Sequence, residues 1–329
     1  MWKYSCFQGS ALIAPGIYVL STYNQTRNSM PRPSNPALED VLGVQYPVLD
    51  HGYITLIDYM GNDDEIVRAA RASISAGQKI SDTKSLIRHL VKNRHTSPIE
   101  QVQMKFQVKM PIFIARQWVR HRTAKLSEFS GRYSKFECEF YVPTLDAIKA
   151  QSKVNKQGSD GELPEETKIK AQETLALNSA EAFDAYVGLI ESGIARETAR
   201  ELLPVNMYTT MIWTMDLHNL LHFINLRMDS HAQYEIQKYA VVLAKFVYIG
   251  FPLLWEAFED FTYGALTLSR LDIVALRLIG DFHGEKFSEE CKTKVEEVFK
   301  NVSRSELNEF FEKLCLITGY MVDGQTKQG

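Results

Sequence analysis

The sequence predicts an α/β protein, because segments with two different periodicities occur along it. Residues Val102–Met110 alternate strictly between apolar and polar side chains, which is typical of a strand with one buried face. Residues Pro164–Ser192 instead carry apolar side chains at helical spacing, and Gly193 follows them as a stop signal. Residues Met207–Met215 are rich in Thr, Ile, Tyr and Trp, which favours a further strand. These segments predict strands packed beside long helices.

The composition is that of an ordinary globular chain. It has 329 residues, 45% of them hydrophobic and 23% charged, so it is long enough to bury a large core. The formal net charge is −3, and no global positive field therefore favours nucleic acid. Its cysteines (Cys6, Cys138, Cys291 and Cys315) lie far apart, which argues against a disulfide framework or a structural zinc.

Nothing in the sequence indicates a membrane segment. No apolar run approaches the roughly 20 residues needed to span a bilayer. Residues Ala11–Leu20 are apolar enough to suggest a secretory signal, but Pro15 and Gly16 interrupt them and only Lys3 precedes them. We therefore expect a cytoplasmic protein that binds neither membranes nor nucleic acid.

The first part of the chain has the composition of a spacer. Residues 1–48 are rich in Pro, Ser and Asn, and we expect a poorly ordered N-terminal extension there. Regular structure is expected from a strand at Tyr53–Ile57, followed by a turn at Gly61–Asp63 and a helix to about Ala72. A second helix is expected at about Asp82–Asn93, where apolar residues recur at helical spacing.

The middle of the chain is expected to alternate between helix, strand and loop. Pro111 stops the strand before it and suits the first turn of a short helix over Ile112–Arg122. The alternation within Phe136–Val142 predicts another strand. Residues Lys149–Leu163 are polar and contain glycine, so a loop is expected there.

The last third is expected to be largely helical. Asp216 caps one helix, and Ser230–Gln233 forms a capping box that opens a longer helix to about Tyr248. Beyond that, residues 266–329 are expected to form a helical C-terminal extension. The central domain would then span residues 49–265.

One unusually polar stretch, Gln117–Tyr133, lies between two apolar segments. Arginines offer fixed forks of donors to phosphate or carboxylate groups. The turn at Ser130-Gly131 adds backbone N–H groups and room for close approach. We therefore predict an anion-binding site, with a solvated basic turn as the alternative. The basic side chains of the stretch are Arg120, His121, Arg122, Lys125 and Arg132.

The order of residues in this stretch resembles the signature of flavin-dependent thymidylate synthases. Arg120-His-Arg is followed, seven residues later, by Ser130-Gly-Arg-Tyr-Ser. The resemblance continues in the same order over about residues 50–265. It departs from the family where Gln101 replaces a histidine, and some relatives carry Asn, Arg and Asn in place of Asp216, His218 and His222. The other blocks that carry it are Ala69-Ala-Arg-Ala-Ser73, His95-Thr-Ser-Pro-Ile-Glu-Gln101, Arg196-Glu-Thr-Ala-Arg200, Asp216-Leu-His-Asn-Leu-Leu-His-Phe223 and Arg227-Met-Asp-Ser-His-Ala-Gln233.

The resemblance implies a single domain with a mixed, mostly antiparallel sheet flanked by long helices. It also implies a homotetramer whose active sites take residues from several subunits. The implied reaction is reductive methylation of dUMP to dTMP, with methylenetetrahydrofolate as carbon donor, NADPH as electron source and FAD as hydride mediator, and without a protein nucleophile.

The resemblance also implies which residues hold each ligand. Arg227 would activate the pyrimidine by stabilising negative charge on the ring. The residues assigned to dUMP are Gln117, Arg120, Glu128, Phe129, Ser130, Gly131, Arg132, Arg200 and Arg227. The residues assigned to FAD are Ser73, His95, Ser97, Arg120, His121, Arg122, Glu128, Asp216, Leu217, His218 and His222.

Several of these residues also have a plainer interpretation. Arg227 ends a helix, where an arginine complements the helix dipole, and Arg200 could form an ion pair within its own helix. Ser130 could be an ordinary turn serine, since a nucleophile needs an oriented base. His218 and His222 are spaced to bind zinc, but no glutamate lies between them and no cysteine is near, so no metal is expected.

Overall fold

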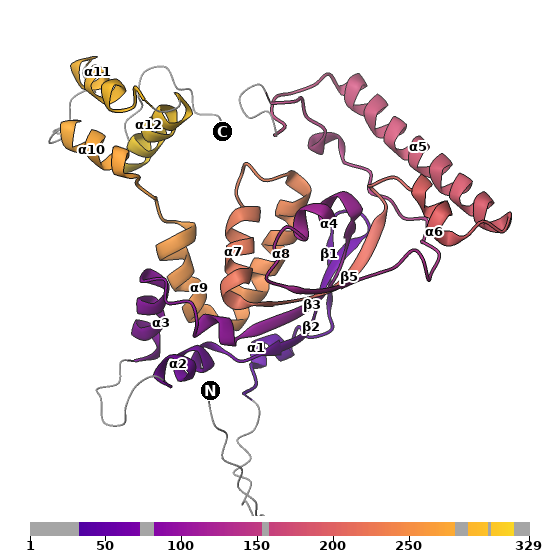
Figure 1. Cartoon of the computed structure of the whole chain (residues 1–329), viewed down its shortest axis with the longest axis horizontal. Coiled ribbons are helices and arrows are strands. Elements are labelled where there is room, and N and C mark those ends of the chain that lie inside the picture. Colours follow the sequence, from indigo (N-terminus) through magenta and orange to yellow (C-terminus); the bar gives the residue numbers. More distant parts are fainter. Residues whose placement is uncertain (1–32, 73–81, 153–157, 280–288, 302–303, 319–329) are drawn as a thin grey trace, which may run out of the picture.

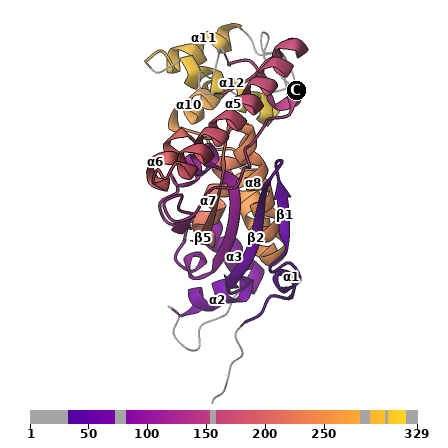
Figure 2. The same cartoon turned by 90° about the vertical axis from the view of Figure 1, so that its right-hand side faces the viewer.

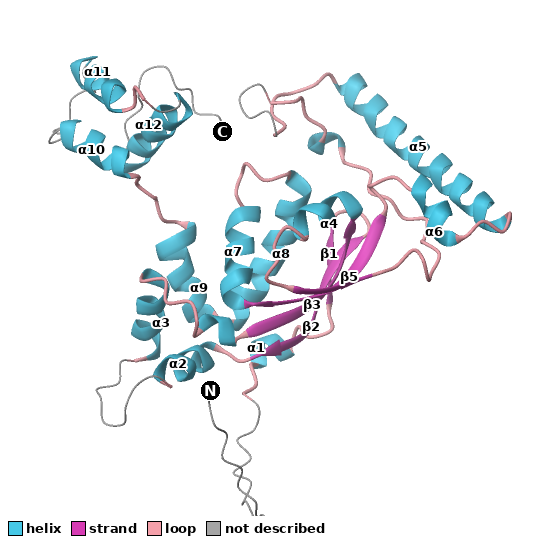
Figure 3. Ribbon diagram, viewed as in Figure 1, coloured by secondary structure: helices cyan, strands magenta, loops and turns pink. Residues whose placement is uncertain are grey.

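The computed structural model describes residues 33–72, 82–152, 158–279, 289–301 and 304–318. Within them, five strands form one sheet in the order β1-β2-β3-β5-β4, and every pair of neighbouring strands is antiparallel. This confirms the expected α/β fold with an antiparallel sheet (Figures 1 and 3). The strands are β1 Gln45–Val48, β2 Gly52–Met60, β3 Gln103–Pro111, β4 Lys125–Glu128 and β5 Tyr208–Asp216.

The sheet is held by the apolar face that the alternation within Val102–Met110 predicts. Every apolar side chain of that alternation is fully buried. The antiparallel register sets Phe106 of β3 opposite Trp213 of β5. The helices that carry Phe223 and Phe246 cover one side of the sheet (Figure 2). The ring of Phe246 lies 5.5 Å from Phe106, and the ring of Phe223 lies 5.5 Å from Trp213. Each such burial contributes about 1.5–3 kcal/mol.

The helices begin largely where the sequence predicts, because their caps are local. The side chains of Asn62, Asp82 and Asp216 accept backbone N–H groups at the starts of α2, α3 and α7. The α-helices of the described residues are α1 Pro36–Glu39, α2 Asp63–Arg71, α3 Thr83–Lys92, α4 Ile112–Trp118, α5 Glu165–Glu191, α6 Arg196–Ala199, α7 Leu217–Arg227, α8 Tyr234–Gly250, α9 Pro252–Phe258, α10 Arg270–Ile279, α11 Glu289–Val298 and α12 Arg304–Thr318.

The folded part of the chain begins earlier than expected. Residues 1–32 lie outside the described residues, but residues 33–48 form α1 and β1 and are not a poorly ordered extension. Leu38 is fully buried, and its side chain lies against Gly250 of α8. The backbone N–H of Asn35 donates to the Tyr59 hydroxyl at 2.7 Å. A segment this short shows no periodicity of its own, so its packing partners are visible only in three dimensions.

The expected strand at Phe136–Val142 is wrong. This segment makes a single isolated bridge, from Phe140 to Met207, and Phe136 packs instead into a small cluster with Tyr186. The outer partner of β5 is β4, which lies inside the polar stretch and is exposed along its length. Alternation alone could not separate a strand from a segment that packs Phe136 and Phe140 into this cluster and leaves Cys138, between them, exposed.

Two predicted helix boundaries also differ from the structure. Helix α4 ends at Trp118 and does not continue to Arg122. Helix α8 begins at Tyr234 without a side-chain cap, so Ser230–Gln233 is not a capping box. Instead, the Asp229 carboxylate accepts the backbone N–H of His231 at 2.8 Å and closes a turn before the helix.

Helix α5 is confirmed, but it packs along only part of its length. Gly193, with φ +85°, ends it in the left-handed region. Phe183 and Tyr186 are buried, whereas Leu175 and Leu177 are 42% and 61% exposed, and the helix extends away from the sheet (Figure 1). No helix in the described part of the chain is long and apolar enough to cross a membrane.

The C-terminal helices have a core of their own. Helices α10, α11 and α12 pack around a separate cluster that does not include residues of the sheet. A buried ion pair also joins two of them, because Lys313 of α12 lies 2.9 Å from Asp272 of α10. The buried members of the cluster are Ala275, Val295, Phe299, Phe310, Phe311 and Leu314.

Candidate active site

Helix α4 carries predicted site residues on two of its faces. Pro111 is extended and stands at the N-cap, so the helix begins where β3 ends. Trp118 is fully buried and anchors the helix against Phe223 of α7, with ring centroids 4.5 Å apart. Gln117 lies on one face of α4 and Arg116 on another, because successive helical residues are about 100° apart. Each face belongs to a different group of predicted site residues.

The first group, the Arg227 cluster, joins the end of α4 to the end of α7. Its members are Gln117, His121, His222, Phe223 and Arg227. The Nε of Arg227 donates to Nε2 of His121 at 3.1 Å, and Nη2 donates to the backbone carbonyl of Gln117 at 3.3 Å. The side-chain amide of Gln117 in turn donates to Gln233. Arg227 is therefore more than a helix-end cation, because it holds two helices together.

The electrostatics of the Arg227 cluster keep His121 neutral. Its ring lies 4.6 Å from the ring of Phe223 and 6.1 Å from that of His222. Burial, the adjacent Arg227 charge and His222 lower the pKa of His121 to about 4. Because an arginine can only donate hydrogen bonds, Nε2 of His121 must be unprotonated and Nδ1 carries the proton.

The second group lines a pocket of about 330 Å³ on another face of α4. This volume lies within the range of about 300–1,000 Å³ found for small-molecule sites. Four of the residues that the sequence assigns to dUMP meet here, from the end of β4, the turn after it and the short helix after α6. The lining includes Arg116, Glu128, Phe129, Gly131, Arg200 and Thr209.

Local contacts fix the polar wall of this pocket. The Thr209 hydroxyl of β5 donates to the Glu128 carboxylate at 2.8 Å. Gly131 is buried against Phe136, and a Cβ at this position would lie 2.3 Å from that ring. Ser130 forms a turn in which its Oγ accepts the backbone N–H of Arg132 at 3.3 Å. The absence of a side chain at Gly131 therefore decides how close this turn lies to the aromatic wall.

Arg132 and Arg200, which both lie near the pocket, differ in their contacts. Arg132 forms an ion pair with Glu197 at 3.0 Å, and both side chains are 56% exposed. The alternative to ligand binding by Arg200 is an ion pair within its own helix. It is exposed and makes no ion pair or side-chain hydrogen bond with the described residues. Its guanidinium is left available to a ligand.

The residues assigned to FAD lie on several elements, and Glu128 among them lines the pocket. His95 and Ser97 are exposed in the segment between α3 and β3, and Gln101 donates to the Ser97 carbonyl at 3.2 Å. Asp216 caps α7, where its Oδ1 accepts the backbone N–H of Asn219 at 2.9 Å. Ser73 lies outside the described residues.

The remaining members of this set suit an anionic, aromatic cofactor. Arg120 and Arg122 are exposed, and neither forms an ion pair within the described part of the chain. His218 follows the buried Leu217 near the start of α7, and His222 lies one turn further on. Exposed guanidinium groups bind phosphates, and imidazole rings offer donors and flat surfaces. This donor set fits a flavin nucleotide.

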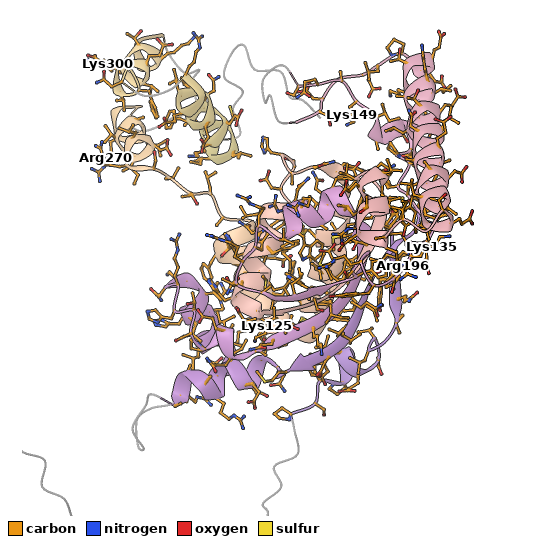
Figure 4. All side chains as sticks on the ribbon, turned by 45° about the vertical axis from the view of Figure 1, so that its right-hand side comes forward. Lys125, Lys135, Lys149, Arg196, Arg270 and Lys300 are labelled. Carbon is orange, nitrogen blue, oxygen red and sulfur yellow. The ribbon has the colours of Figure 1, made fainter. Side chains whose placement is uncertain are left out.

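The basic side chains labelled in Figure 4 lie on several elements of the described chain. Lys125 lies by the sheet, and Lys135 and Arg196 lie near the base of α5. Arg270 and Lys300 lie on the C-terminal helices.

The structure adds residues that the sequence did not indicate. Arg116 and Thr209 line the pocket, and Phe136 supports its turn. Arg116 precedes the predicted Gln117, and its spacing of three and four from Val119 and Ile112 could have placed all three on one face. Nothing in the sequence links Phe136 to the site, because its contact joins segments far apart in the chain.

Comparison with known proteins gives consistent matches. A family model described as thymidylate synthase complementing protein matches residues 55–253. A flavin-dependent thymidylate synthase of Thermus thermophilus is 49% identical over 232 residues, which is 70% of this chain and 84% of that protein. One of Rickettsia conorii is 42% identical over 289 residues, or 83% of this chain and 98% of that protein.

A solved structure agrees with these relatives. The UMP/dUMP methylase PolB from Streptomyces cacaoi, bound with 5-Br dUMP, is 31% identical and superposes with a TM-score of 0.60. The match covers 66% of this chain and 99% of that one. These matches confirm both the fold and the resemblance inferred from the sequence.

Proposed function

The chain belongs to the thymidylate synthase complementing protein family of flavin-dependent thymidylate synthases, and we propose that it methylates dUMP to dTMP. In this reaction methylenetetrahydrofolate gives one carbon to C5 of the pyrimidine, and NADPH gives the hydride that completes the methyl group. Two C–N bonds of the folate break, one C–C bond forms and C5 loses a proton. The two folate nitrogens regain protons, so one proton is taken from solvent. The products are dTMP, tetrahydrofolate and NADP⁺.

The observation that carries the proposal is the placement of Arg227. Its guanidinium is half-buried and fixed by His121 and by the Gln117 carbonyl. A fixed cation beside the ring stabilises the negative charge that develops when N3 of the pyrimidine ionises. This charge makes C5 nucleophilic without a covalent bond to the protein. Ser130 is therefore not needed as a nucleophile in this proposal, and its Oγ accepts the backbone N–H of Arg132.

The pocket would bind the nucleotide through its phosphate. Arg200 lines it with a guanidinium that pairs with no described residue, and Gly131 lets the turn pack closely against Phe136. Glu128, held by Thr209, would accept hydrogen bonds from the sugar or base. The remaining proposed dUMP residues are Gln117, Arg120, Phe129, Ser130 and Arg132.

A bound FAD would relay the hydride from NADPH to the transferred carbon. Around it, the exposed Arg120 and Arg122 would bind the phosphates. Asp216 would act indirectly, by capping the helix that carries the two histidines. The other proposed FAD residues are Ser73, His95, Ser97, His121, Glu128, Leu217, His218 and His222.

The site is proposed to need more than one chain. Within one chain, α4 lies between the Arg227 cluster and the pocket, so the two groups face different ways. A homotetramer would let the cluster of one subunit meet the pocket of another. The exposed Leu175 and Leu177 of α5 support such an interface, because unpaired apolar side chains along a helix favour association.

The domain limits and location of the proposed enzyme follow from the same interpretation. We propose that the catalytic domain spans residues 33–265 and that α10–α12 form an extension with a separate core. Cys138 is an exposed free thiol, which suits a reducing compartment, so a cytoplasmic location is part of the proposal.

The test is a reconstituted assay on the purified full chain. The flavin spectrum is recorded, and dTMP is measured with dUMP, methylenetetrahydrofolate and NADPH, with each omitted in turn. We expect dTMP only in the complete mixture, and faster NADPH oxidation when dUMP is present. UMP serves as the comparison substrate. A protein that binds flavin but forms no dTMP under any of these conditions contradicts the proposal.

A further inference from the structure

Arg227 is held in an unusual way for a partly buried arginine. No carboxylate of the described residues forms an ion pair with it, and its partners are a neutral imidazole and a main-chain carbonyl. Burial lowers the pKa of Arg227, but a guanidinium stays charged in proteins. Its positive charge is therefore oriented by the protein without being neutralised.

The two hydrogen bonds use one edge of the guanidinium. The group carries five N–H donors in a rigid plane. Nε and Nη2 lie along the same edge, and they point to His121 and to the Gln117 carbonyl. One N–H of Nη1 and the second N–H of Nη2 point to the other end of the group, and no described residue accepts them. Such an end presents two parallel N–H groups to two adjacent acceptor atoms.

His121 is itself fixed in the orientation that this contact needs. Its ring packs against Phe223 of α7, a residue that is fully buried. Its neighbours in the cluster, Arg227 and His222, both disfavour a charge on the ring. The imidazole therefore offers a lone pair at Nε2 in place of an N–H, and only a lone pair can face an arginine.

We propose that His121 is the positioning residue for Arg227. Its unprotonated Nε2 turns the guanidinium so that the Nη1–Nη2 end faces the imide edge of the pyrimidine, where ionised N3 lies beside a carbonyl oxygen. This inference rests on the proposed function and deepens it. It gives His121 a role through Arg227, in addition to any contact with the flavin.

The experiment compares two substitutions that differ only in hydrogen bonding. His121→Leu keeps an apolar side chain against Phe223 but has no acceptor, whereas His121→Gln offers an oxygen near the position of Nε2. His51→Leu is the matched control, because His51 lies in the exposed turn between β1 and β2. The probe is 5-bromo-dUMP, whose N3 ionisation is followed by ultraviolet absorbance while it is bound to the flavin-loaded protein.

The expected results separate a positioning role from a merely structural one. In the wild-type protein, bound 5-bromo-dUMP ionises at lower pH than the free nucleotide. In His121→Leu we expect this midpoint to rise by about one pH unit and dTMP turnover to fall about tenfold, the scale of one lost hydrogen bond to a charged group. In His121→Gln we expect most of the wild-type ionisation midpoint and of the wild-type turnover to be recovered. His51→Leu should match the wild type in both measurements.

Other results would overturn the inference. If His121→Leu ionises bound 5-bromo-dUMP as the wild type does, His121 does not position Arg227. Failure of the wild-type protein to bind the nucleotide contradicts the proposed function instead. If His121→Leu does not fold, ¹⁵N spectra of His121 in the wild-type protein decide the matter. A protonated Nε2 at neutral pH excludes the hydrogen bond on which the inference depends.

Discussion

The Arg227 cluster and the pocket both present arginine guanidinium groups, but the group is held by hydrogen bonds in the cluster and is exposed in the pocket. In the cluster, Arg227 is half-buried and two of its donors are already engaged. In the pocket, Arg116 and Arg200 are exposed and form no ion pair with described residues. One guanidinium is therefore fixed before the ligand arrives, whereas the others can adjust to it.

This difference matches the different tasks of a ring site and a phosphate site. Charge that develops only during a reaction is stabilised best by a group that need not reorganise. A phosphate is charged throughout, so flexible arginines can bind it by forming several charge-assisted hydrogen bonds. We therefore propose that Arg227 acts in the chemical step and that the pocket provides affinity.

The largest effect is expected from removing the fixed guanidinium. Arg227→Ala should lower kcat by about 100- to 1,000-fold, the range for loss of one preorganised electrostatic group, while the flavin spectrum is retained. Arg227→Lys should recover little, because a lysine cannot form both hydrogen bonds of the fork. The measurement is single-turnover dTMP formation at saturating dUMP. Normal turnover by Arg227→Ala would remove Arg227 from the chemistry.

A smaller effect, on binding, is expected at the pocket. Arg200→Gln should raise the KM for dUMP by about 10- to 100-fold, since hydrogen bonds to charged groups contribute about 1.5–3 kcal/mol, and should leave kcat nearly unchanged. Arg68→Gln is the control, because Arg68 is an exposed arginine of α2 that pairs with Glu65. A fall in kcat with constant KM would reverse the assignment of the two regions.

Gly131 connects the turn to the aromatic wall of the pocket. Gly131→Ala would place a Cβ 2.3 Å from the Phe136 ring, so we expect a loss of about 1–3 kcal/mol of stability and weaker dUMP binding. The added substitution Phe136→Ala should relieve the clash. The control is Gly188→Ala in α5, which has open space around it and should stabilise the helix by about 0.5–1 kcal/mol. Thermal unfolding measures the stability, and calorimetric titration measures dUMP binding. An unchanged Tm for Gly131→Ala would contradict the expected clash and show that the Phe136 ring moves freely.

The smallest effect on stability is expected from Arg132. Its pair with Glu197 is exposed on both sides, and such pairs contribute about 0–1 kcal/mol. Glu197→Gln should therefore change Tm little, and it should release Arg132 to the ligand without raising the KM for dUMP. Arg132→Gln should raise that KM by about tenfold if a charged hydrogen bond to the ligand is lost. If both variants raise KM equally, the ion pair itself shapes the pocket.

Local patterns in the sequence predicted much of the fold. The alternation within Val102–Met110 predicted β3 correctly, because successive residues of a strand point to opposite faces of the sheet. The cap at Asp216 and the stop at Gly193 are also local, and both are confirmed. The order of the blocks that carry the family resemblance can likewise be read from a single sequence, without knowledge of three-dimensional contacts.

Features that depend on distant partners could not be predicted in this way. The exposed strand β4 has no apolar face of its own, and it exists because its backbone pairs with β5. Phe136 and Phe140 alternate like a strand, yet they pack beside Tyr186 of α5. The bond from Arg227 to His121 joins residues 106 positions apart. No periodicity indicates such a contact.

The separation of the cluster and the pocket by α4 is tested most directly by mixing two defective chains. Arg227→Ala and Arg200→Glu are co-expressed with different tags, purified together and assayed at low dUMP. If the sites are shared between copies, about a quarter of them receive both intact arginines in a randomly assembled symmetric oligomer, and activity returns to that level. If activity stays at the level of the separate variants, both arginines act within one chain and the account is contradicted.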